Sequence, residues 1–567
     1  MHKKINIYQV MPRIWGNTKT NLRLNGTYSE NGCGTLADFS TQALQHIASL
    51  GCNYIWYTGI IEHASKTSLP QAERHTNPSL VKGEAGSPYA ILDYYNIHPT
   101  LCQDPATGLK EFKDLIKRSH QAKLQVIIDF VPNHVARQYK ATHRPKGRLD
   151  LGEKDDTTHS FHPQNNFYYI VAENLQLQIG LSNDEINYSE QPAKATGNDC
   201  FHAFPNSNDW YETIKLNYGI NYQDGTLHAD PIPDTWTKML DILLFWSKLG
   251  VDGFRCDMVH MVPVAFWQWA IHKVKEQYKN MLFIGELYEQ ALYRPYIEVA
   301  GFDYLYDKIG LYDTLRLIIQ EGYSARAITN NWQRNEGIGQ RMLHFMENHD
   351  EQRIASTFFA CDAWKGVPAM MVSAWLNSNA TLLYFGQELG ETGMQTEGYS
   401  GCDGRTSIFD YCTIDKIMRL NNNGLWNAEK LTEEERKLQQ AYSDILNIAL
   451  RESAIAKGAF FDLMYANPDS EYFHGEHVYT FMRKHEQELL LIVVNFSDQE
   501  QVCQIQIPQH AFDHWRIQPD HYPYKELMTQ EEGFLCLNAN CTVNCTVGAH
   551  YGRVFRIKSK TLNKEEK

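Results

Sequence analysis

Four short segments of the sequence each place acidic, basic or imidazole side chains at the end of an apolar run. They are DFVPNH (129–134), GFRCD (253–257), GE (285–286) and ENHD (347–350). Taken singly, each acid is typical of a helix cap or a loop anchor. Together, if the four runs are strands of one sheet, they bring carboxylates, one arginine and two histidines to one site. Clustered carboxylates cost free energy, and a shifted carboxyl pKa is a use that would justify the cost.

Two close carboxylates with a third nearby are the groups that glycoside transfer needs. In the retaining reaction one carboxylate attacks the anomeric carbon and the other protonates the leaving oxygen, at a separation of about 5–5.5 Å. The acid needs a raised pKa, which burial and a neighbouring carboxylate supply. Arg255 precedes Asp257 by two residues, so both side chains point to one side of a strand. The guanidinium is expected to keep Asp257 ionised.

Eight apolar runs are predicted as strands, and amphipathic helices lie between them. Many of the runs are continuous, as in strands buried on both faces. Repeated strand–helix units predict a parallel sheet, and eight of them predict a closed (β/α)8 barrel with reactive groups at the C-terminal strand ends. Helices are predicted at 36–51, 235–250 and 262–278. The predicted strands are 5–10, 53–58, 124–131, 250–257, 282–288, 302–307, 341–348 and 380–386.

The remaining segments do not show the strand–helix alternation, and they predict two further domains. Residues 135–232 are polar and too long for an ordinary loop, so they are predicted as a small domain inserted after the third strand. Residues 453–567 contain short strand-like runs and are predicted as an antiparallel β-sandwich. The barrel then comprises 1–134 and 233–452. The predicted fold class is α/β: a TIM barrel with an inserted small domain and a C-terminal β-sandwich.

Composition limits the partners and the compartment. The 567 residues carry a formal net charge of −14, which argues against binding to nucleic acids or to anionic membranes. Polar residues interrupt any apolar core of a signal peptide, and the twelve cysteines are scattered, which is typical of reduced thiols. A cytoplasmic location is therefore expected, although a secreted chain trimmed of its leader would read the same. The sequence makes no prediction of the oligomeric state.

The four segments resemble, in order, the motifs of the α-amylase family (glycoside hydrolase family 13). GCNYIWYTGI (51–60) and LLYFGQELG (382–390) resemble the family's motifs on strands two and eight. KLN (215–217) resembles the motif of its inserted domain, nearer to the neopullulanase and maltogenic amylase types. The resemblance extends from residue 1 to about residue 560. It implies the same barrel, inserted domain and sandwich, and an activity on α-glucans.

The resemblance also implies roles for individual residues. Asp257 matches the nucleophile, Glu286 the general acid/base, and Asp350 the carboxylate that stabilises the transition state. Tyr89 matches a tyrosine that stacks under the sugar, with core packing as the alternative, and Trp210 is either a sugar platform or part of the small domain's own core. Arg405 is a weaker candidate for substrate contact. The remaining substrate-binding candidates are Asp129, His134, Arg255, His260 and His349.

The sequence departs from the family pattern after the nucleophile. Many amylases have a Lys-His pair where this chain has His260 and Met261. That pair contacts the leaving-side sugar and helps to hold calcium, so leaving-side specificity and the metal are both in question. Asn133 is the one side chain that matches the family's calcium position. No cofactor is predicted to be required, and no metal ligand set is predicted.

The predicted function is retaining hydrolysis of α-1,4 bonds in maltooligosaccharides or starch fragments through a covalent glycosyl–Asp257 intermediate. Two alternatives remain open. A sugar hydroxyl in place of water would make the same site a transglycosylase or a disaccharide isomerase such as trehalose synthase. An inactive sugar-binding relative is the other alternative, although such proteins usually lack a carboxylate and this chain has all three. Chain length and the choice between α-1,4 and α-1,6 bonds are not predicted.

Overall fold

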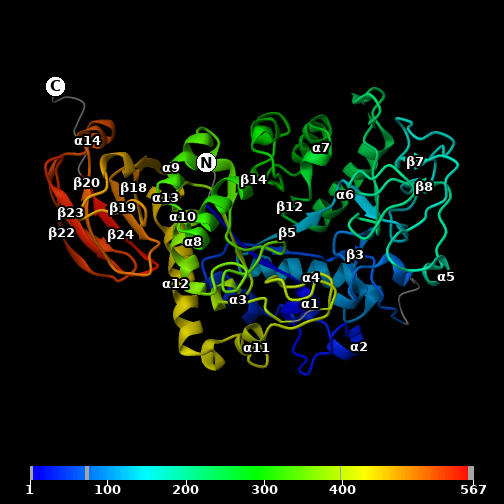
Figure 1. Ribbon diagram of the computed structural model, residues 1–567, viewed down its shortest axis with the longest axis horizontal. Helices are drawn as coiled ribbons and strands as arrows, with labels where there is room; N and C mark the ends of the chain where they lie inside the picture. Colours follow the sequence, from blue (N-terminus) through cyan, green and yellow to red (C-terminus); the bar gives the residue numbers. More distant parts are fainter. Residues whose placement is uncertain (1–3, 70–75, 396–397, 560–567) are drawn as a thin grey trace.

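A barrel occupies the centre of the protein, with an inserted segment at one end of the long axis and an antiparallel sheet at the other (Figure 1). The computed structural model describes residues 4–69, 76–395 and 398–559. Within these residues no helix is long and apolar enough to cross a membrane.

The barrel is closed by eight parallel strands, and each of the eight predicted strands is one of them. Their order around the barrel is β1-β16-β15-β14-β13-β12-β5-β2. The fold prediction is therefore confirmed. The strands are β1 (Ile5–Val10), β2 (Tyr54–Tyr57), β5 (Gln125–Phe130), β12 (Gly253–Cys256), β13 (Leu282–Gly285), β14 (Tyr304–Tyr306), β15 (Met342–His344) and β16 (Ala380–Tyr384).

Burial on both faces explains why these strands are apolar throughout. Every residue of β1, β12 and β16 is buried, because side chains fill the barrel on one face and helices cover the other. The helices include α3 (Thr41–Ser49), α4 (Gly108–Gln121), α6 (Asp234–Leu249), α7 (Val264–Gln277), α8 (Asp313–Glu321), α10 (Gly366–Trp375) and α12 (Glu433–Arg451).

Helix ends follow local capping chemistry. Helix α6 stops at Gly250, which has φ 116° and donates its N–H to two carbonyls of the last turn. The predicted helix over 36–51 begins later than expected, at Thr41. The reason is that the Ser40 hydroxyl accepts from the Ala43 N–H at 3.2 Å and caps the helix there, after a separate 3-10 turn over Leu36–Asp38.

The segment between β5 and α6 is built from short two-stranded pairings in place of a large sheet. Strand β6 (His134–Ala136) pairs with β9 (Thr213–Lys215), which brings the far end of the insertion back to the barrel rim. Further pairs are β7 (Tyr169–Ile170) with β8 (Ala193–Lys194), and β10 (Ile220–Asn221) with β11 (Thr226–Leu227).

The C-terminal region is an antiparallel sheet in the order β17-β18-β19-β24-β21-β22, together with the pair β20–β23. Strand β19 is its apolar centre, since Leu489 to Val494 are all buried. The bounds are β17 (Ala459–Asp462), β18 (Val478–His485), β19 (Glu488–Asn495), β20 (Gln501–Gln506), β21 (Asp520–Glu526), β22 (Glu532–Leu537), β23 (Thr542–Val547) and β24 (Tyr551–Lys558).

Candidate active site

The register of two neighbouring strands brings Asp257 and Glu286 to the same height on the barrel rim. Strands β12 and β13 are parallel, and Cys256 pairs with Gly285 at their C-terminal ends. Asp257 and Glu286 are the next residues of each strand, so they leave the sheet side by side. A side chain at Gly285 would have its Cβ 2.8 Å from Leu305 Cδ2, which explains the glycine before the acid.

Arg255 joins the two acids from below. Its Nη1 donates to Asp257 Oδ1 at 2.8 Å, and its Nη2 lies 2.8 Å from Glu286 Oε1. The guanidinium is buried, and its Nε donates to the Tyr306 hydroxyl at 3.2 Å. Burial first, and then the negative charge of Glu286, raise the pKa of Asp257 well above its usual value, against the effect of Arg255.

Glu286 is held by two further hydrogen bonds. The Tyr288 hydroxyl donates to Oε1 at 2.6 Å, and the Met258 N–H donates to Oε2 at 2.9 Å. Met258 has φ 41° and ψ 50°, a left-handed conformation that costs a non-glycine residue free energy. This strained residue directly after Asp257 turns its N–H toward the neighbouring acid.

Asp350 approaches from β15 with His349 beside it. His349 Nδ1 lies 2.8 Å from the Gln9 side-chain nitrogen, which donates to it, so the ring proton sits on Nε2. Nε2 lies 3.1 Å from Asp350 Oδ2. Burial lowers the pKa of His349 well below its usual value, so the ring is neutral. Removal from bulk water, followed by the charge of Glu286, raises the pKa of Asp350 to about 7.

Asp129 and Tyr89 complete the group around Arg255. Asp129 accepts from the indole N–H of Trp56 at 3.2 Å and from the Gly59 N–H at 3.2 Å, and burial raises its pKa to about 6. The Tyr89 ring stacks on the His349 ring, with 5.2 Å between the ring centroids. The Arg255 guanidinium carbon lies 5.3 Å from the centroid of the same Tyr89 ring. Tyr89 thus lines the cavity and also packs against the hydrophobic core.

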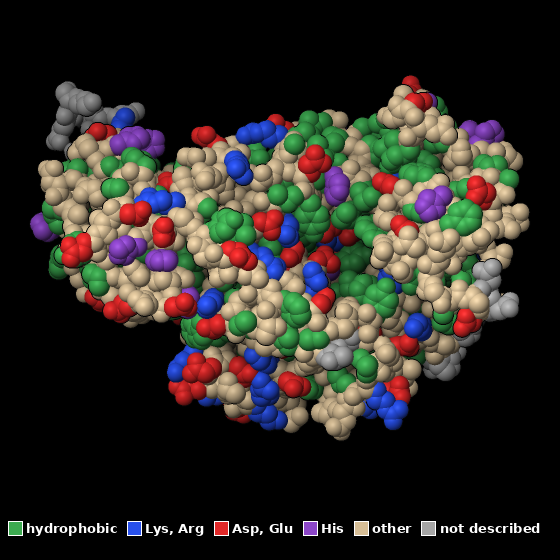
Figure 2. All heavy atoms as spheres, viewed as in Figure 1, with side chains coloured by type: hydrophobic (Ala, Val, Ile, Leu, Met, Phe, Trp, Pro, Cys, Tyr) green, Lys and Arg blue, Asp and Glu red, His purple; other side chains and the backbone are tan. Residues whose placement is uncertain are grey.

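These groups open into a cavity of about 380 Å³. The hollow lies between the barrel and the insertion, and Figure 2 shows it in the middle of the visible face. Arg255, Asp129 and His349 lie beneath it and contact the residues that line it. The lining residues are Lys82, Ser87, Tyr89, His134, Trp210, Glu212, Thr213, Asp257, Met258, Glu286, Tyr288, Asp350 and Phe409.

Two other candidates lie on the insertion side. Trp210 lines the cavity and meets the His134 ring edge to face at 5.2 Å. Burial and the charge of Lys215 lower the pKa of His134 to about 3, so this ring is neutral too.

His260 is half-buried and is not among the described residues that line the cavity. Arg405 contacts the backbone of a site residue: its Nε donates to the Asp350 carbonyl at 2.6 Å.

Asn133, the residue at the expected calcium position, contacts a lysine. Lys215 Nζ donates to Asn133 Oδ1 at 2.8 Å and lies 2.5 Å from Asp199 Oδ1, and the Lys215 side chain is 1% exposed. The Asn133 side-chain nitrogen donates to the Gly197 carbonyl at 2.7 Å. Calcium needs six to eight oxygen ligands, and a buried ammonium among them repels the ion. These residues therefore fit a lysine ammonium and do not fit calcium.

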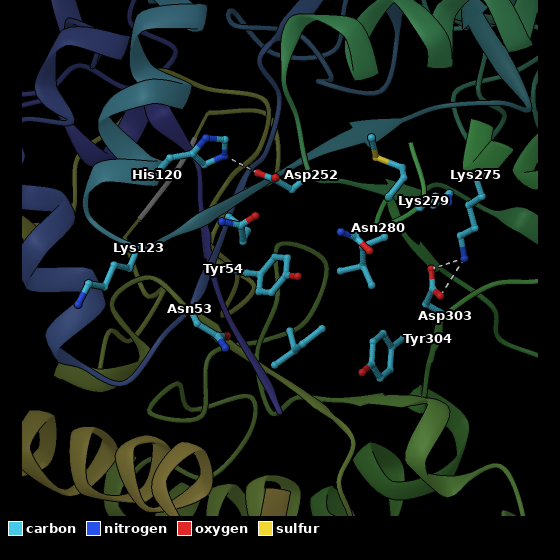
Figure 3. Close-up of a pocket in the computed structure, with 14 residues that line it drawn as sticks. Asn53, Tyr54, His120, Lys123, Asp252, Lys275, Lys279, Asn280, Asp303 and Tyr304 are labelled. Atoms are coloured by element: carbon cyan, nitrogen blue, oxygen red, sulfur yellow. Dashed lines mark hydrogen bonds and ion pairs between the residues drawn. The ribbon is translucent and has the colours of Figure 1, made fainter. Parts of the chain in front are cut away.

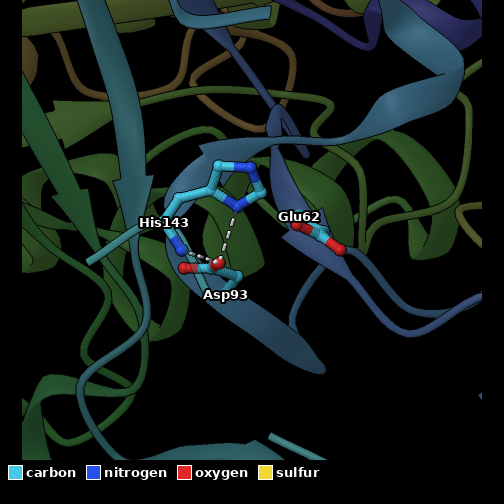
Figure 4. Close-up of side chains that lie close together, drawn as sticks. All are labelled: Glu62, Asp93 and His143. Atoms are coloured by element: carbon cyan, nitrogen blue, oxygen red, sulfur yellow. Dashed lines mark hydrogen bonds and ion pairs between the residues drawn. The ribbon is translucent and has the colours of Figure 1, made fainter. Parts of the chain in front are cut away.

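A second group of metal-type ligands, drawn in Figure 4, is not among the described residues that line the cavity. Among the described residues, Glu62, Asp93 and His143 bring their ligand atoms within 4.8 Å of one another. His143 Nδ1 lies 3.1 Å from Asp93 Oδ2, and the same oxygen accepts from the His143 N–H at 3.0 Å. The Asn96 amide donates to Glu62 at 2.8 Å. The His143 contacts fasten the 142–143 loop to β4 (Ile91–Ile97), and the Asn96 bond joins β4 to β3 (Ile61–His63), which is a structural role.

Several residues that contact the site were not among the sequence-based candidates. Tyr288 stands two residues after Glu286, the same spacing as Arg255 and Asp257, so the period of a strand could have indicated it. Gln9 and Trp56 stand near the ends of β1 and β2, where the barrel rule points to the rim. Lys82 and Glu212 lie outside the barrel strands, and no sequence pattern marks them.

The fold and the rim together define a class: a (β/α)8-barrel protein with a carboxylate site of the type used on glycosides. Comparison with known proteins gives the family, since the family description "Alpha amylase, catalytic domain" matches residues 24–447. The chain belongs to the α-amylase family, as its motifs predicted.

Similar proteins include hydrolases and transferases. The chain is 22% identical over 426 residues to an alpha-amylase of Streptomyces lividans, covering 66% of this chain and 42% of that protein. It is 31% identical over 281 residues to an alpha-1,4-glucan:maltose-1-phosphate maltosyltransferase of Cereibacter sphaeroides, covering 48% and 36%. The chain thus spans less than half of the length of these relatives. The alpha-amylase of Geobacillus thermoleovorans, solved with acarbose, has a similar fold, with a TM-score of 0.64, 18% identity, and 99% and 100% of the two chains covered.

Proposed function

We propose that this chain is a retaining enzyme that hydrolyses α-1,4 bonds of maltooligosaccharides or starch-type glucans. The observation that carries the proposal is the position of Arg255, whose two terminal nitrogens each lie 2.8 Å from one acid, Asp257 on one side and Glu286 on the other. Acids bridged by one guanidinium are close together. Close acids favour the retaining separation of about 5–5.5 Å over the wider inverting one.

The first step is attack of ionised Asp257 on the anomeric carbon while protonated Glu286 gives its proton to the leaving oxygen. Burial and the charge of Glu286 raise the pKa of Asp257, and Arg255 acts against that rise. Arg255 bonds to both acids and stabilises the negative charge that they share. In the second step Glu286 takes a proton from water, and the hydroxyl group displaces Asp257 from the sugar.

The surrounding residues support positive charge at the anomeric carbon and grip the sugar. Asp350 lies on the cavity wall, where its carboxylate can accept bonds from sugar hydroxyls and stabilise the oxocarbenium-like transition state. The neutral imidazole of His134 lines the cavity and can supply one N–H donor without adding a positive charge, whereas the Nε2 of His349 lies against Asp350. Tyr89 presents a ring face to the sugar.

Calcium is not needed in this proposal, because the Lys215 ammonium already bonds Asn133 and Asp199 at the corresponding position. We expect activity and thermal unfolding to be unchanged by a chelator such as EDTA. Lys215→Met should lower the unfolding temperature, since a buried Asn133 oxygen loses its donor. A chelator-induced loss of activity in the unaltered protein, reversed by added calcium, would contradict this part of the proposal.

Product analysis tests the reaction itself. Maltotriose alone should give glucose and maltose, released first with the α-configuration as read by proton NMR. Longer products would instead assign transfer, which the maltosyltransferase relative makes the second candidate. A parallel panel of maltooligosaccharides, pullulan and cyclodextrins reports bond and chain-length preference, and faster cleavage of cyclodextrins than starch indicates a neopullulanase-like specificity. If none of these glucans yields a product, the proposal is wrong.

A further inference from the structure

Lys82 and Glu212 form an ion pair in the wall of the active-site cavity. Lys82 Nζ lies 3.0 Å from Glu212 Oε2, and the two side chains are only 12% and 7% exposed. Both residues line the same cavity as Asp257 and Glu286. Lys82 comes from the segment before Tyr89, and Glu212 from the insertion directly before β9. Two distant parts of the chain therefore deliver opposite charges to one wall of the cavity.

The ammonium retains hydrogen-bonding capacity. Lys82 has three N–H donors. One points to Glu212, and a second reaches the Asp209 carbonyl at a long 3.5 Å. The Tyr211 ring covers another side of the ammonium, 5.2 Å from its centroid. Burial raises the pKa of Glu212, and the charge of Lys82 acts against that rise. A donor and an acceptor thus stand side by side where a substrate passes.

The charges in the cavity indicate which substrates fit. Its acids are Asp257, Glu286, Asp350 and Glu212, and among the described lining residues Lys82 is the basic side chain that carries a charge, since His134 is neutral. Glu212 neutralises that charge. A phosphate group would require an unneutralised cation, usually an arginine or a lysine. Neighbouring hydroxyls of a neutral sugar need only one donor and one acceptor.

We infer that Lys82 and Glu212 bind the hydroxyl groups of a neutral glucose unit next to the cleavage site, and that their pairing selects against phosphorylated sugars. This inference rests on the proposed function and narrows its substrate class. It sets the chain apart from a relative named for maltose 1-phosphate. Among the described residues that line the cavity, no lysine or arginine is without a neutralising acid.

Three variants test the pair: Lys82→Met, Glu212→Gln and, as a matched control, Lys66→Met. Lys66 forms a similar ion pair with Glu84, also at 3.0 Å, but it lies outside the cavity lining and is more exposed. Steady-state kinetics with maltohexaose should show KM raised about 3- to 10-fold in Lys82→Met, the worth of one hydrogen bond, with kcat changed far less. Lys66→Met should match the unaltered protein.

Glu212→Gln tests the charge argument. It leaves the ammonium without a negative charge to neutralise it, so maltose 1-phosphate should bind at least about 10-fold more tightly, and Lys82→Met/Glu212→Gln should lose that gain. Calorimetric titration in an Asp257→Asn background measures maltohexaose and maltose 1-phosphate binding without turnover. Binding therefore tests the pair even if no glucan is hydrolysed, which separates failure of the inference from failure of the proposed function.

Two results would overturn the inference. One is maltohexaose binding in Lys82→Met equal to that in Lys66→Met. The other is a preference of the unaltered protein for maltose 1-phosphate over maltohexaose. Thermal unfolding of each variant checks its fold, and Lys82→Arg keeps the charge if Lys82→Met unfolds. Lys82→Arg should then preserve the discrimination against the phosphorylated sugar.

Discussion

The two ends of the barrel each carry a cavity lined by acids and tyrosines, and the larger cavity is at the end that does not hold the catalytic motifs. At the N-terminal ends of the strands lies a cavity of about 810 Å³, against about 380 Å³ at the C-terminal ends. Figure 3 shows its ion pairs: Asp252 with His120 and Asp303 with Lys275. Each of these acids has a base of its own.

At the C-terminal ends the acids share a base. Asp257 and Glu286 both bond Arg255, and Asp129 lies 3.7 Å from the same guanidinium. At the other end Asp252 also accepts the Val126 N–H at 2.8 Å, and Asp303 the Phe283 N–H at 2.8 Å, so each anchors the start of a strand. Competition for one positive charge, and not volume, therefore distinguishes a site that can move protons from one that fastens strands.

The largest expected difference between the two ends is in turnover. Asp257→Asn should lower kcat at least about 100-fold with the fold intact, because the amide cannot attack the anomeric carbon. Asp303→Asn, its counterpart at the opposite end, should leave kcat on maltohexaose within about twofold, since it lies far from the site. Initial rates and circular dichroism check both. Residual activity above about one per cent in Asp257→Asn would remove Asp257 from the nucleophile role.

A smaller difference is expected between two tyrosines. Tyr288→Phe removes the 2.6 Å hydrogen bond to Glu286, and a hydrogen bond is worth about 0.5–1.5 kcal/mol, so kcat should fall about 3- to 10-fold. Tyr54→Phe, in the opposite cavity, should not change kcat. Equal kcat values in the two variants would show that Tyr288 does not position Glu286.

The barrel was predictable because its signals are local and repeated. Eight apolar runs with helices between them gave every barrel strand, and the position of an acid at a strand end placed Asp257, Glu286 and Asp350 on one rim. Helix starts were less predictable: Ser40 sets the start of α3 through a single hydroxyl contact. The domain boundaries around 135–232 and 453–567 stay a prediction.

The insertion side of the cavity was not predictable, because long-range packing creates it. Lys82 and Glu212 are 130 positions apart and meet only when β9 pairs with β6 and closes the loop. The same pairing sets Lys215 against Asn133, which the motif alone associated with calcium. A motif gives the identity of one partner, while the charge that faces it comes from a segment that the motif does not contain.

Replacing an acid should change stability in opposite directions at the two ends, and the larger change is expected at Asp350. Its pKa of about 7 in the folded protein is above its unfolded value of about 3.9. A raised carboxyl pKa favours the folded state at low pH, and this contribution is lost as the pH rises through 7. Asp350→Asn should therefore unfold at a higher temperature than the unaltered protein at pH 8 and at nearly the same temperature near pH 4. A lower unfolding temperature at pH 8 would contradict this assignment.

The smallest expected effect is at Asp252, where the substitution should destabilise the fold. The hydrogen bond from His120 to Asp252 raises the pKa of His120, so this contact stabilises the fold below about pH 6.5 and loses its contribution as the pH rises through the folded pKa. The pair is partly exposed, so Asp252→Asn should cost about 1 kcal/mol or less at pH 5.5, and less again at pH 8.5. Urea unfolding at the two pH values measures both costs. A larger cost at pH 8.5 would mean that Asp252 acts mainly through the Val126 N–H, and the contrast between paired and shared charges would then rest on the C-terminal rim alone.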